Sequence, residues 1–599
     1  MITYRNEVAG QPVTINVVET EEDLDGFRDF IRSHLTFLGL DSETTGLDIY
    51  ADDFRCRLVQ FGTPDESWVV PVELGPRFQQ DVRLALKGVN GFVLHNASFD
   101  LQVFERTLGV PMEEMWPKVT DTRILAHLID PRAKEEGGTG QSLEDLTRRL
   151  IDPEIADNVK TLMADLAKEH KTTKANVWKK VDLWDPHYLL YSGFDPILAA
   201  RVLQKLVGPL KSAAPQSLIS YEHRLAEVCS YMERTGFLLD VDYSTELRSE
   251  LKLKESLANE TALEWGCEKV NSTDAVADVL EEYGVKIIGR TPSGKRKVDD
   301  ALLQKVIDEH PDGVGEFAQS VIDAKKAGKW RKTWVESFLR GRDAEDRCHA
   351  SINPLRARTA RMSISGIPAQ TLPSKDWIIR RCFVADEGHL ISSVDYKSQE
   401  LRVLAALSED PTMIQAFLDE ADLHQITADA SGVDRSVGKM ANFLTVYGGG
   451  GKTLADQAKI SIAQAKKVLD GFAQAYPRVR ALSERLQRSA SSVGYITTPE
   501  GRRLPVDETR AYSALNYLIQ STSRDVTGKA IVRLHDAGMT PYLRLPIHDE
   551  VLLSLPEGHA EAIAEEVGEI MTDQIGPVVI GTDPEVGGLS WGSLYGADD

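Results

Sequence analysis

The chain has 599 residues, which is too many for one hydrophobic core, so several domains are expected. The hydrophobic fraction of 42% and the charged fraction of 27% are typical of soluble globular proteins. The net charge of −23 excludes attraction of nucleic acid by the chain as a whole, so a nucleic-acid surface would depend on a local cluster of cations.

The cysteines are scattered along the chain and form no Cys-x-x-Cys pair, which argues against a zinc knuckle or a disulfide framework. The N-terminal residues lack the basic and apolar segments of a secretory signal, and no apolar run is long enough to span a membrane. We therefore predict a cytoplasmic protein without a membrane partner.

Residues 1–205 alternate between short apolar runs and helical segments, the pattern of an α/β domain. Asp41 and Glu43 end one predicted strand and point to one side of it, because strand side chains alternate. Asp100 follows another predicted strand, and Asp195 lies in a helical segment. Four carboxylates can share a site when cations neutralise them, and a pair of divalent ions held by oxygen ligands cleaves phosphodiesters.

The motifs that carry these acids are Asp41-x-Glu43, Asn96-x-x-x-Asp100 and Tyr191-x-x-x-Asp195. In order and spacing they resemble the three motifs of the DnaQ-like 3′–5′ exonucleases. The resemblance implies an RNase H-like domain over residues 1–208, in which Tyr191 orients the attacking water. It also implies that the metal ligands are Asp41, Glu43, Asp100 and Asp195. Asp121 is predicted to be a structural helix cap.

A run of small residues and prolines at 206–222 predicts a domain boundary. Beyond it, residues 232–240, 271–273 and 291–295 resemble the thumb of family A DNA polymerases, which we place at 209–344. The segment lacks the long insertion that holds a thioredoxin processivity partner in some phage polymerases. That mode of processivity is therefore not expected.

A basic cluster lies near the end of the predicted thumb. Lys329 and Lys332 are candidate DNA contacts, because Trp330 and Trp334 alternate with the cations and favour a DNA-facing surface. The alternative is a solvated helix face.

Acids also lie at the ends of predicted strands in the second half of the chain. Asp395 ends one strand, and Asp549 and Glu550 lie at the tip of a predicted hairpin. These segments resemble motifs A and C of family A DNA polymerases. The resemblance implies that Asp395, Tyr396 and Asp549 hold two magnesium ions, with manganese as a substitute, and that Glu550 is a secondary metal ligand or a structural acid.

Arg435, Lys439, Phe443 and Tyr447 recur every fourth residue, so one stripe of a predicted helix carries two cations and two rings. A nucleoside triphosphate has a polyanionic end and a flat end, and it fits such a stripe. An amphipathic helix with exposed cations is the simpler alternative. Residues 434–448 resemble motif B of family A DNA polymerases.

The resemblance to family A also assigns the nucleotide contacts, which are Arg435, Lys439, His424, Phe443, Tyr447, Glu400 and Tyr396. The cations and the histidine would offset the phosphate charge, and Lys439 would donate a proton to pyrophosphate. Phe443 would stack beside the sugar and base, and Tyr447 would hold the templating position. Glu400 lies where the family excludes a ribose 2′-hydroxyl.

The family's contacts to the minor groove and the primer terminus fall on Arg361, Asn516, Gln520 and His548. Every correct base pair presents acceptors at similar places in that groove, which permits checking that does not depend on sequence. The chain departs from the family pattern at Thr359-Ala360-Arg361, Lys397-Ser398-Gln399, Tyr512 and Gln520-Ser521. These departures concern fidelity and the template slot and leave the metal ligands unchanged.

Together these features predict an α/β and α+β multidomain protein with an RNase H-like exonuclease domain followed by a right-hand polymerase domain. The predicted domains are the exonuclease (1–208), the thumb (209–344), the first part of the palm (345–410), the fingers (411–497) and the second part of the palm (498–599).

The predicted function is template-directed synthesis on primer-template DNA with dNTPs, with proofreading, in the replication of a bacteriophage genome. A repair or gap-filling polymerase is the alternative. A non-catalytic DNA-binding scaffold is a second alternative, which the intact Asp395, Asp549 and Lys439 oppose. A monomer is expected, with a helicase or a single-strand-binding protein as candidate partners.

Overall fold

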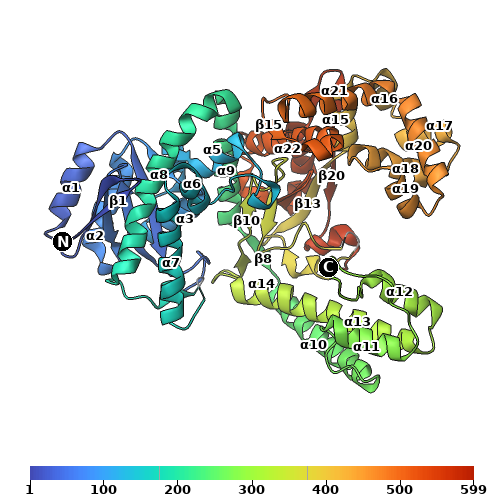
Figure 1. The fold of residues 1–599 in the computed structure, drawn as a ribbon, viewed down its shortest axis with the longest axis horizontal. Helices are drawn as coiled ribbons and strands as arrows, with labels where there is room; N and C mark the ends of the chain where they lie inside the picture. Colours follow the sequence, from blue (N-terminus) through green and yellow to red (C-terminus); the bar gives the residue numbers. More distant parts are fainter. Residues whose placement is uncertain (174–175, 374–375, 599) are drawn as a thin grey trace.

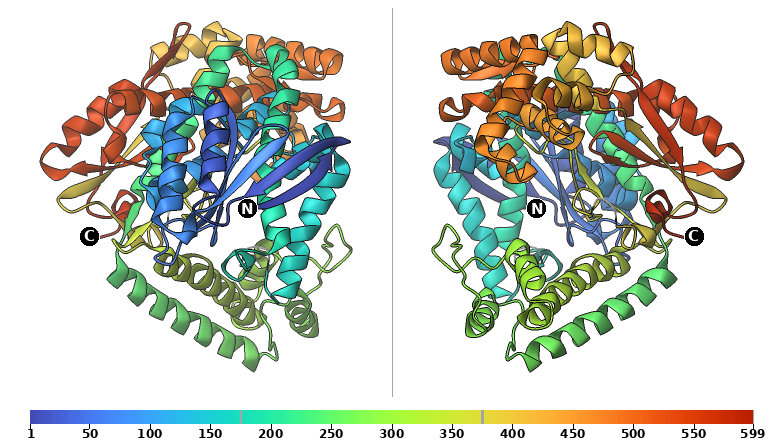
Figure 2. Two further views of the ribbon diagram at one scale, coloured as in Figure 1. Left: turned by 90° about the vertical axis from the view of Figure 1, so that its left-hand side faces the viewer. Right: turned by 90° about the vertical axis from the view of Figure 1, so that its right-hand side faces the viewer.

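The computed structural model describes residues 1–173, 176–373 and 376–598. Figure 1 shows an N-terminal body at the left, a helical arm below and a C-terminal body at the right. In the side views of Figure 2 the arm, drawn in green, extends below the rest of the molecule.

A mixed seven-stranded sheet forms the centre of the N-terminal body. Its strands are, in spatial order, β1 (Ile2–Val8), β2 (Gln11–Val17), β5 (Glu66–Pro71), β4 (Cys56–Gly62), β3 (Leu38–Thr44), β6 (Phe92–Leu94) and β7 (Val119–Asp121). β4 is buried along its whole length, as expected for a central strand that is covered on both faces. β4 and β5 form an antiparallel pair.

Helices cover both faces of this sheet because its strands are apolar on both sides. Val59 and Phe61 belong to the core beneath α1 and α2, whereas Leu58 belongs to the core beneath α7 and α8. The helices of this body are α1 (Leu24–Ser33), α2 (Pro76–Gly88), α3 (Ala97–Leu108), α4 (Met112–Met115), α5 (Thr122–Ile129), α6 (Leu143–Leu150), α7 (Pro153–Glu169) and α8 (Pro186–Ala213).

Two long helices join the N-terminal body to the rest of the chain. α8 continues through Pro209 to Ala213, and α9 (Gln216–Thr235) begins after a break of two residues. The break lies within the small-residue run at 206–222, whereas residue 208 itself lies inside α8. α9 packs against α3 and α5 on one side and against α22 (Ala514–Asp536) on the other.

The helical arm has a core of its own. Its helices are α10 (Val241–Glu264), α11 (Thr273–Glu282), α12 (Asp300–Glu309), α13 (Val314–Lys329) and α14 (Glu336–Gly341), with a π-helical turn at Trp330–Val335 between the last two. Trp330 and Trp334 are each only 5% exposed. The prediction that these two rings face DNA was therefore wrong. Both rings pack into the core, because this face of the helix meets α10 and the rest of the C-terminal body.

A four-stranded antiparallel sheet lies at the centre of the C-terminal body. Its order is β16 (Leu543–Ile547), β17 (Glu550–Pro556), β13 (His389–Tyr396) and β20 (Thr582–Val586). α23 (Ala560–Met571) packs against it, α22 packs on α23, and α15 (Gln399–Ser408) and α21 (Pro477–Val493) pack on α22. Small sheets pair β8 (Phe237–Leu239) with β9 (Arg347–Cys348) and β12 (Phe383–Val384), β10 (Ser351–Asn353) with β11 (Ser363–Ser365), β14 (Tyr495–Thr497) with β15 (Arg503–Pro505), and β18 (Asp573–Ile575) with β19 (Val578–Ile580).

A second helical lobe projects from this sheet at the upper right of Figure 1. It contains α16 (Pro411–Leu418), α17 (Leu423–Ser431), α18 (Arg435–Val446), α19 (Gly451–Ala458) and α20 (Ile462–Ala475). α17 and α18 approach closely at Gly438, where a Cβ atom would lie 2.4 Å from the carbonyl oxygen of His424. This close contact brings His424 beside α18.

A buried cluster of ions fastens α9 to the C-terminal body. Glu222 accepts hydrogen bonds from Arg502 at 2.5 Å and from Arg524 at 2.6 Å, and Asp525 completes the cluster. All four side chains are at most 4% exposed, so removing one partner would leave an uncompensated buried charge. Among the residues described, no helix is both long and apolar enough to cross a membrane.

Candidate active sites

One acidic site lies in the N-terminal body. Asp41 and Glu43 project from the same side of β3, and Asp195 comes from α8. One ligand atom from each of these three residues lies within 4.8 Å of the others. The structure thus brings together the first and third predicted motifs, which are far apart in sequence.

A glycine makes this convergence sterically possible. A Cβ atom at Gly39 would lie only 2.1 Å from the carbonyl oxygen of Pro196. Gly39 precedes Asp41 by two residues on β3, and Pro196 follows Asp195 on α8. The missing side chain therefore allows α8 to approach β3 closely enough for the two carboxylates to meet.

Asp100 lies beside this group at the start of α3 and is held by Ser42, the residue between Asp41 and Glu43. Ser42 Oγ donates a hydrogen bond to Asp100 Oδ1 at 2.6 Å. Asp121 caps α5 by accepting from the amide of Arg123, as predicted, and it also accepts from the amides of Asn96 and Ala97 just before α3. Sequence reasoning did not identify Ser42, although its position between Asp41 and Glu43 was a usable signal.

The electrostatics of the site favour a bound cation. Burial, followed by repulsion from the neighbouring acids, raises the pKa of Asp41 and of Glu43 well above their ordinary values. Burial likewise raises the pKa of Asp100 and of Asp195 to about 7. Oxygen-only ligands in a repulsive, buried cluster suit a hard divalent cation.

Tyr191 lies one helical turn before Asp195 and hydrogen bonds to its carboxylate. The negative charge of Asp195, together with burial, raises the pKa of the Tyr191 hydroxyl well above its ordinary value. The hydroxyl therefore stays protonated and can donate to an oxygen in the site.

The second acidic site lies at the end of the central sheet of the C-terminal body. Asp395 on β13 pairs with Glu550 on β17, and the amide of Tyr396 donates to the carbonyl oxygen of Asp549 at 3.2 Å. Asp549 follows His548, which adopts a positive φ of 58° at the tip of the hairpin. This turn directs the acids of motif C toward Asp395.

A cavity of about 450 Å³ opens at this end of the sheet and gathers residues from all three predicted polymerase motifs. The predicted site residues that line it are Asp395, Tyr396, Glu400, Phe443, Tyr447, Gln520, His548, Asp549 and Arg361. They come from β13, α15, α18, α22, the β16–β17 hairpin and the loop between β10 and β11, so the convergence depends on the tertiary structure.

Burial, then the charges of Asp549 and Glu550, raises the pKa of Asp395 to about 7. Burial also raises the pKa of Asp549 and of Glu550. Ser393 Oγ donates to Glu550 Oε1 at 2.6 Å. This contact holds Glu550 on the sheet and fits the structural role, one of the two roles that were predicted for this residue. Asp583 on β20 pairs with Asp395 from the other side and was not identified from the sequence.

The side chain of Tyr396 does not reach the predicted site. Its ring is 2% exposed and its hydroxyl donates to the carbonyl oxygen of Met571 at 2.7 Å. Strand side chains alternate, so the side chain next to Asp395 must point to the opposite face of β13. Only the main chain of Tyr396 remains available to a metal ion or a nucleotide.

Asn516 is buried, and its Nδ2 donates to the carbonyl oxygen of Val446 at 3.1 Å, so it supports the end of α18 and does not line the cavity. Gln520 donates to Asn516 Oδ1 at 3.1 Å and accepts from Thr359 at 3.2 Å. In this structure the amide of Gln520, and not that of Asn516, borders the cavity.

Phe443 and Tyr447 reach the cavity. Arg435 and Lys439 lie on the same stripe nearer the N-terminal end of α18, where they are exposed and do not line the cavity. Arg435 pairs with Asp422, and Lys439 Nζ lies 6.0 Å from the centre of the Phe443 ring. The stripe is therefore continuous from exposed cations to half-buried rings.

His424 is held in place beside α18. Asn442 Nδ2 lies 2.9 Å from His424 Nδ1, and Thr427 donates to Asn442 Oδ1 at 2.6 Å. Burial and the nearby Arg435 and Lys439 lower the pKa of His424, which favours the neutral ring. Asn442 was missed because an isolated asparagine in a helix gives no pattern signal.

Lys329 and Lys332 lie on the helical arm outside both acidic sites. Lys329 Nζ lies 5.1 Å from the Trp334 ring, and Lys332 pairs with Glu255 at 2.8 Å. Both ammonium groups are exposed, so they remain accessible to a phosphate backbone.

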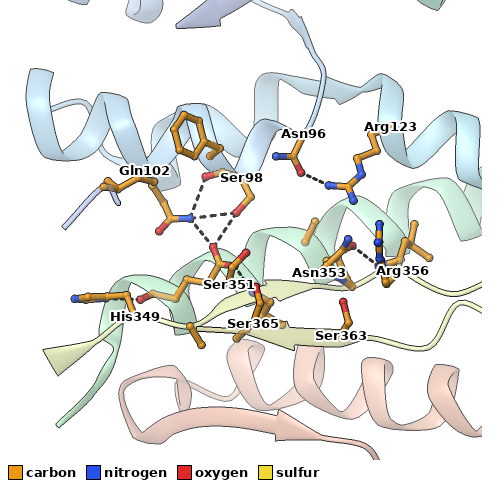
Figure 3. A pocket seen from close by; sticks show the side chains of 18 of the residues that line it. Asn96, Ser98, Gln102, Arg123, His349, Ser351, Asn353, Arg356, Ser363 and Ser365 are labelled. Carbon is orange, nitrogen blue, oxygen red and sulfur yellow. Dashed lines mark hydrogen bonds between the residues drawn. The ribbon is translucent and has the colours of Figure 1, made fainter. Parts of the chain in front are cut away.

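A pocket of about 490 Å³ lies between the N-terminal and C-terminal bodies (Figure 3). One wall carries Asn96, Ser98, Gln102 and Arg123, and the opposite wall carries polar side chains of β10, β11 and the loop between them. Leu47 and Phe99 also line the pocket. Phe99 precedes Asp100 directly on α3, but none of the four acids of the first site lines the pocket.

A carboxylate on β13 and a second at the tip of the β16–β17 hairpin, opposite a helix with cations and rings, define the catalytic centre of a nucleotide polymerase, and the first acidic cluster adds a nuclease. Residues 241–593 match the model of DNA polymerase family A, and residues 16–210 match that of a 3′–5′ exonuclease domain. The chain belongs to DNA polymerase family A.

Two phage proteins named DNA polymerase are similar over their full lengths. That of Mycobacterium phage L5 is 59% identical over 599 residues, and that of Mycobacterium phage D29 is 56% identical over 608 residues, with 100% of both chains covered in each case. The thermostable DNA polymerase I of Thermus aquaticus is 31% identical over 404 residues, which is 62% of this chain and 47% of that protein.

Among solved structures, the POL domain of Pol1 from M. smegmatis in complex with DNA primer-template and dNTP has a TM-score of 0.72 at 21% identity. The match covers 96% of this chain and 100% of that one, and it shows the same fold. The predicted fold class is confirmed: an exonuclease domain precedes a right-hand polymerase domain, and the chain is a DNA polymerase with a 3′–5′ exonuclease.

Proposed function

We propose that this chain extends a primer 3′-hydroxyl with dNTPs under the direction of a template, and that its N-terminal domain removes mispaired nucleotides from the same end. The observation that carries the proposal is the cavity in which Asp395, Asp549, Glu400 and Phe443 meet. The two carboxylates lie at the sheet end of the cavity and the ring lies on α18, so a nucleotide between them would have its phosphates near the acids and its base near the ring.

Both acidic sites fit divalent cations, because their ligands are oxygens whose mutual repulsion a cation would relieve. Asp395, Asp549 and the main chain of Tyr396 would hold them in the polymerase site, and Asp41, Glu43, Asp100 and Asp195 in the exonuclease site. Two Mg²⁺ ions per site, with Mn²⁺ as a substitute, would supply neutralisation of phosphate charge and activation of the attacking hydroxyl or water.

The remaining chemistry belongs to side chains of the chain itself. Arg435 and Lys439 would attract the triphosphate, Lys439 would give a proton to the leaving pyrophosphate, and neutral His424 would contact a phosphate oxygen. In the exonuclease site, the protonated hydroxyl of Tyr191 would orient the attacking water.

Discrimination would depend on Glu400, Phe443 and Tyr447. Glu400 is half-buried and lines the same cavity as Phe443, where its carboxylate would exclude a ribose 2′-hydroxyl. Tyr447, half exposed at the end of α18, would hold the templating position. Contacts to the primer-template duplex fall to Arg361, Gln520 and His548 around the cavity, and to Lys329 and Lys332 on the arm.

We assign the predicted thumb, residues 209–344, to α9 and the helical arm, and the predicted fingers, residues 411–497, to the lobe that carries α18. The palm is then the central sheet with its flanking helices. An unpaired primer end would pass from the polymerase domain to the exonuclease domain along the pocket between them, which Ser98 and Phe99 of α3 line.

The full-length similarity to polymerases of Mycobacterium phages supports a role in phage genome replication, in the cytoplasm of the host cell. We expect a monomer that acts on primer-template DNA, with a helicase or a single-strand-binding protein as replication partners.

Primer extension by two inactivated variants tests the proposal. Asp549→Ala should reduce extension by about 10³-fold or more while digestion of single strands is kept, because one carboxylate of the metal pair is lost. Asp41→Ala combined with Glu43→Ala should do the reverse. Glu557→Ala, at the far end of β17, is the control and should leave both activities unchanged. Extension retained by Asp549→Ala would refute the assignment of the polymerase site.

A further inference from the structure

Glu233 is a buried carboxylate between the two catalytic domains. It lies on α9, outside both segments that match the family models, and is 7% exposed. Burial raises its pKa to about 7. A charged side chain buried at such a place requires donors, and these come from both domains.

The exonuclease domain supplies two donors from α3. Gln102 Nε2 donates to Glu233 Oε2 at 2.5 Å, and Ser98 Oγ donates to the same oxygen at 3.2 Å. The polymerase domain supplies the amide of Ile352 on β10, which donates to Glu233 Oε1. Each carboxylate oxygen is thus engaged by a different domain.

A ring of contacts closes around this carboxylate. Tyr50 OH donates to Gln102 Oε1 at 2.7 Å, and the Tyr50 ring stacks on His349 with centroids 3.5 Å apart and planes 12° from parallel. His349 Nδ1 in turn donates to the carbonyl oxygen of Glu233 at 2.7 Å. The ring therefore returns to the residue from which it started, having crossed between the domains twice.

This arrangement lies on the wall of the interdomain pocket. Gln102 and Ser98 appear together on α3 in Figure 3, opposite Ser351 and His349 of the polymerase domain. α3 also carries Asp100 between Ser98 and Gln102. The same short segment thus bears an exonuclease acid and the hydrogen bonds to Glu233.

We propose that Glu233 is a positioning residue that couples the two activities, because it holds α3 in a fixed place relative to β10. An unpaired primer end that leaves the polymerase site then meets the exonuclease acids in the correct position for cleavage. This inference rests on the proposed editing function. Digestion of a free single strand, which does not need the polymerase domain, does not depend on Glu233, and neither does extension of a matched primer.

Each contact around Glu233 has a defined donor and acceptor, so exchanging donor and acceptor between Glu233 and Gln102 tests the proposal. In Glu233→Gln, the new amide can still accept from Ile352, but its NH₂ group faces the donor Nε2 of Gln102. In Gln102→Glu, two carboxylates face each other. In the double variant the new amide donates to the new carboxylate, Ser98 Oγ can donate to that same carboxylate, and Tyr50 still donates to its acceptor. Only the bond that Gln102 Nε2 donates to the carbonyl oxygen of Ser98 at 3.1 Å is lost.

The variants would be compared by removal of a 3′-terminal mismatch from primer-template, digestion of a free oligonucleotide, and extension of a matched primer. Each single variant should slow mismatch removal by about tenfold, and the double variant should recover it to within about twofold, as expected for a directly coupled pair. The other two activities should stay within about twofold throughout. Glu113→Gln, which removes the exposed ion pair with Arg234 at the same domain boundary, is the matched control and should change none of them.

Three results would overturn the proposal: unchanged mismatch removal in Glu233→Gln, equal loss of all three activities, or a double variant no better than the two single changes combined. The assays on free strands and matched primers test the proposed function separately, because they would fail without any substitution if it were wrong. If thermal unfolding shows that Glu233→Gln does not fold, Tyr50→Phe tests the same ring. It keeps the stacking on His349, removes the hydrogen bond to Gln102, and should slow mismatch removal alone by about threefold; an unchanged rate would refute the proposal.

Discussion

The carboxylate of Glu400 is held in place in the polymerase cavity by two neighbouring side chains. Arg361 Nη2 donates to Glu400 Oε1 at 2.6 Å, and the hydroxyl of Tyr447 also hydrogen bonds to Glu400. These two contacts come from different segments of the chain and hold the carboxylate beside Phe443. A residue predicted to read the duplex, Arg361, is therefore also a support for the residue predicted to exclude ribonucleotides.

Phe443 offers a test at the scale of a single side chain. Phe443→Tyr should ease incorporation of dideoxynucleotides relative to dNTPs by about fivefold, because a phenolic hydroxyl can replace the contact of the missing 3′-hydroxyl and one hydrogen bond is worth about 1 kcal/mol. Competition between ddTTP and dTTP in single-nucleotide extension measures the ratio. An unchanged ratio would remove Phe443 from the sugar site.

At the scale of elements, two contacts between a glycine and a neighbouring backbone place the catalytic groups. Gly39 lets α8 approach β3 in the exonuclease site, and Gly438 lets α17 approach α18 beside the nucleotide site. The glycines after α18 end that helix: Gly448 has a φ of +71°, and Gly450 precedes the first residue of α19. These glycines therefore act as a helix stop between α18 and α19.

Gly39→Ala should separate the two activities. The new methyl group would meet the carbonyl oxygen of Pro196, so α8 must shift, and Asp195 shifts with it. Single-strand digestion should fall by about 100-fold, as expected for a displacement of about 1 Å at a catalytic group, while primer extension is kept. Overpacking should also cost about 1–3 kcal/mol in the stability of this domain, measurable by thermal unfolding.

The matched control for this change is Gly88→Ala at the end of α2, where a Cβ atom would meet open space. It should preserve both activities and the melting temperature. Normal digestion by Gly39→Ala would show that the close approach of α8 to β3 is not needed for catalysis.

At the scale of the whole molecule, the raised pKa values link stability to pH and to divalent cations. The exonuclease acids Asp100 and Asp195 keep their protons up to about pH 7 in the folded protein, whereas in the unfolded chain an aspartate releases its proton near pH 4. Between these values the folded state binds more protons than the unfolded state, so stability falls as the pH rises. A cation that binds the ionised carboxylates opposes this loss.

We therefore expect the metal-free protein to unfold at a lower temperature at pH 8 than at pH 6, and Mg²⁺ to raise the melting temperature more at pH 8. Differential scanning fluorimetry in EDTA and in MgCl₂ at both pH values measures the effect. Asp41→Ala combined with Glu43→Ala should reduce the difference, because two of the four carboxylates with raised pKa values are then absent. An equal Mg²⁺ effect at both pH values would contradict the linkage.

Much of the exonuclease and polymerase sites could be predicted because their motifs are short and local. Period-two alternation places Asp41 and Glu43 on one side of a strand, and period-four spacing places Arg435 and Phe443 on one side of a helix. The resemblance placed Tyr396 in the site without saying which of its atoms would serve, and alternation next to Asp395 turns the side chain away and leaves only the main chain. Trp330 and Trp334 were misread because a pattern of cations and rings does not say which of them faces the core.

By itself, the sequence determined the family, the order of the two catalytic domains and the acids that each carries, since these depend on residue type and on spacing within single elements. The tertiary structure alone decided which of those residues meet. Ser42, Ser393 and Asn442 are ordinary polar residues in sequence, and their importance comes from a hydrogen bond to an acid or a histidine that packing brings within reach. The same is true of Glu233, whose donors lie more than a hundred residues away on either side, in the exonuclease and polymerase domains.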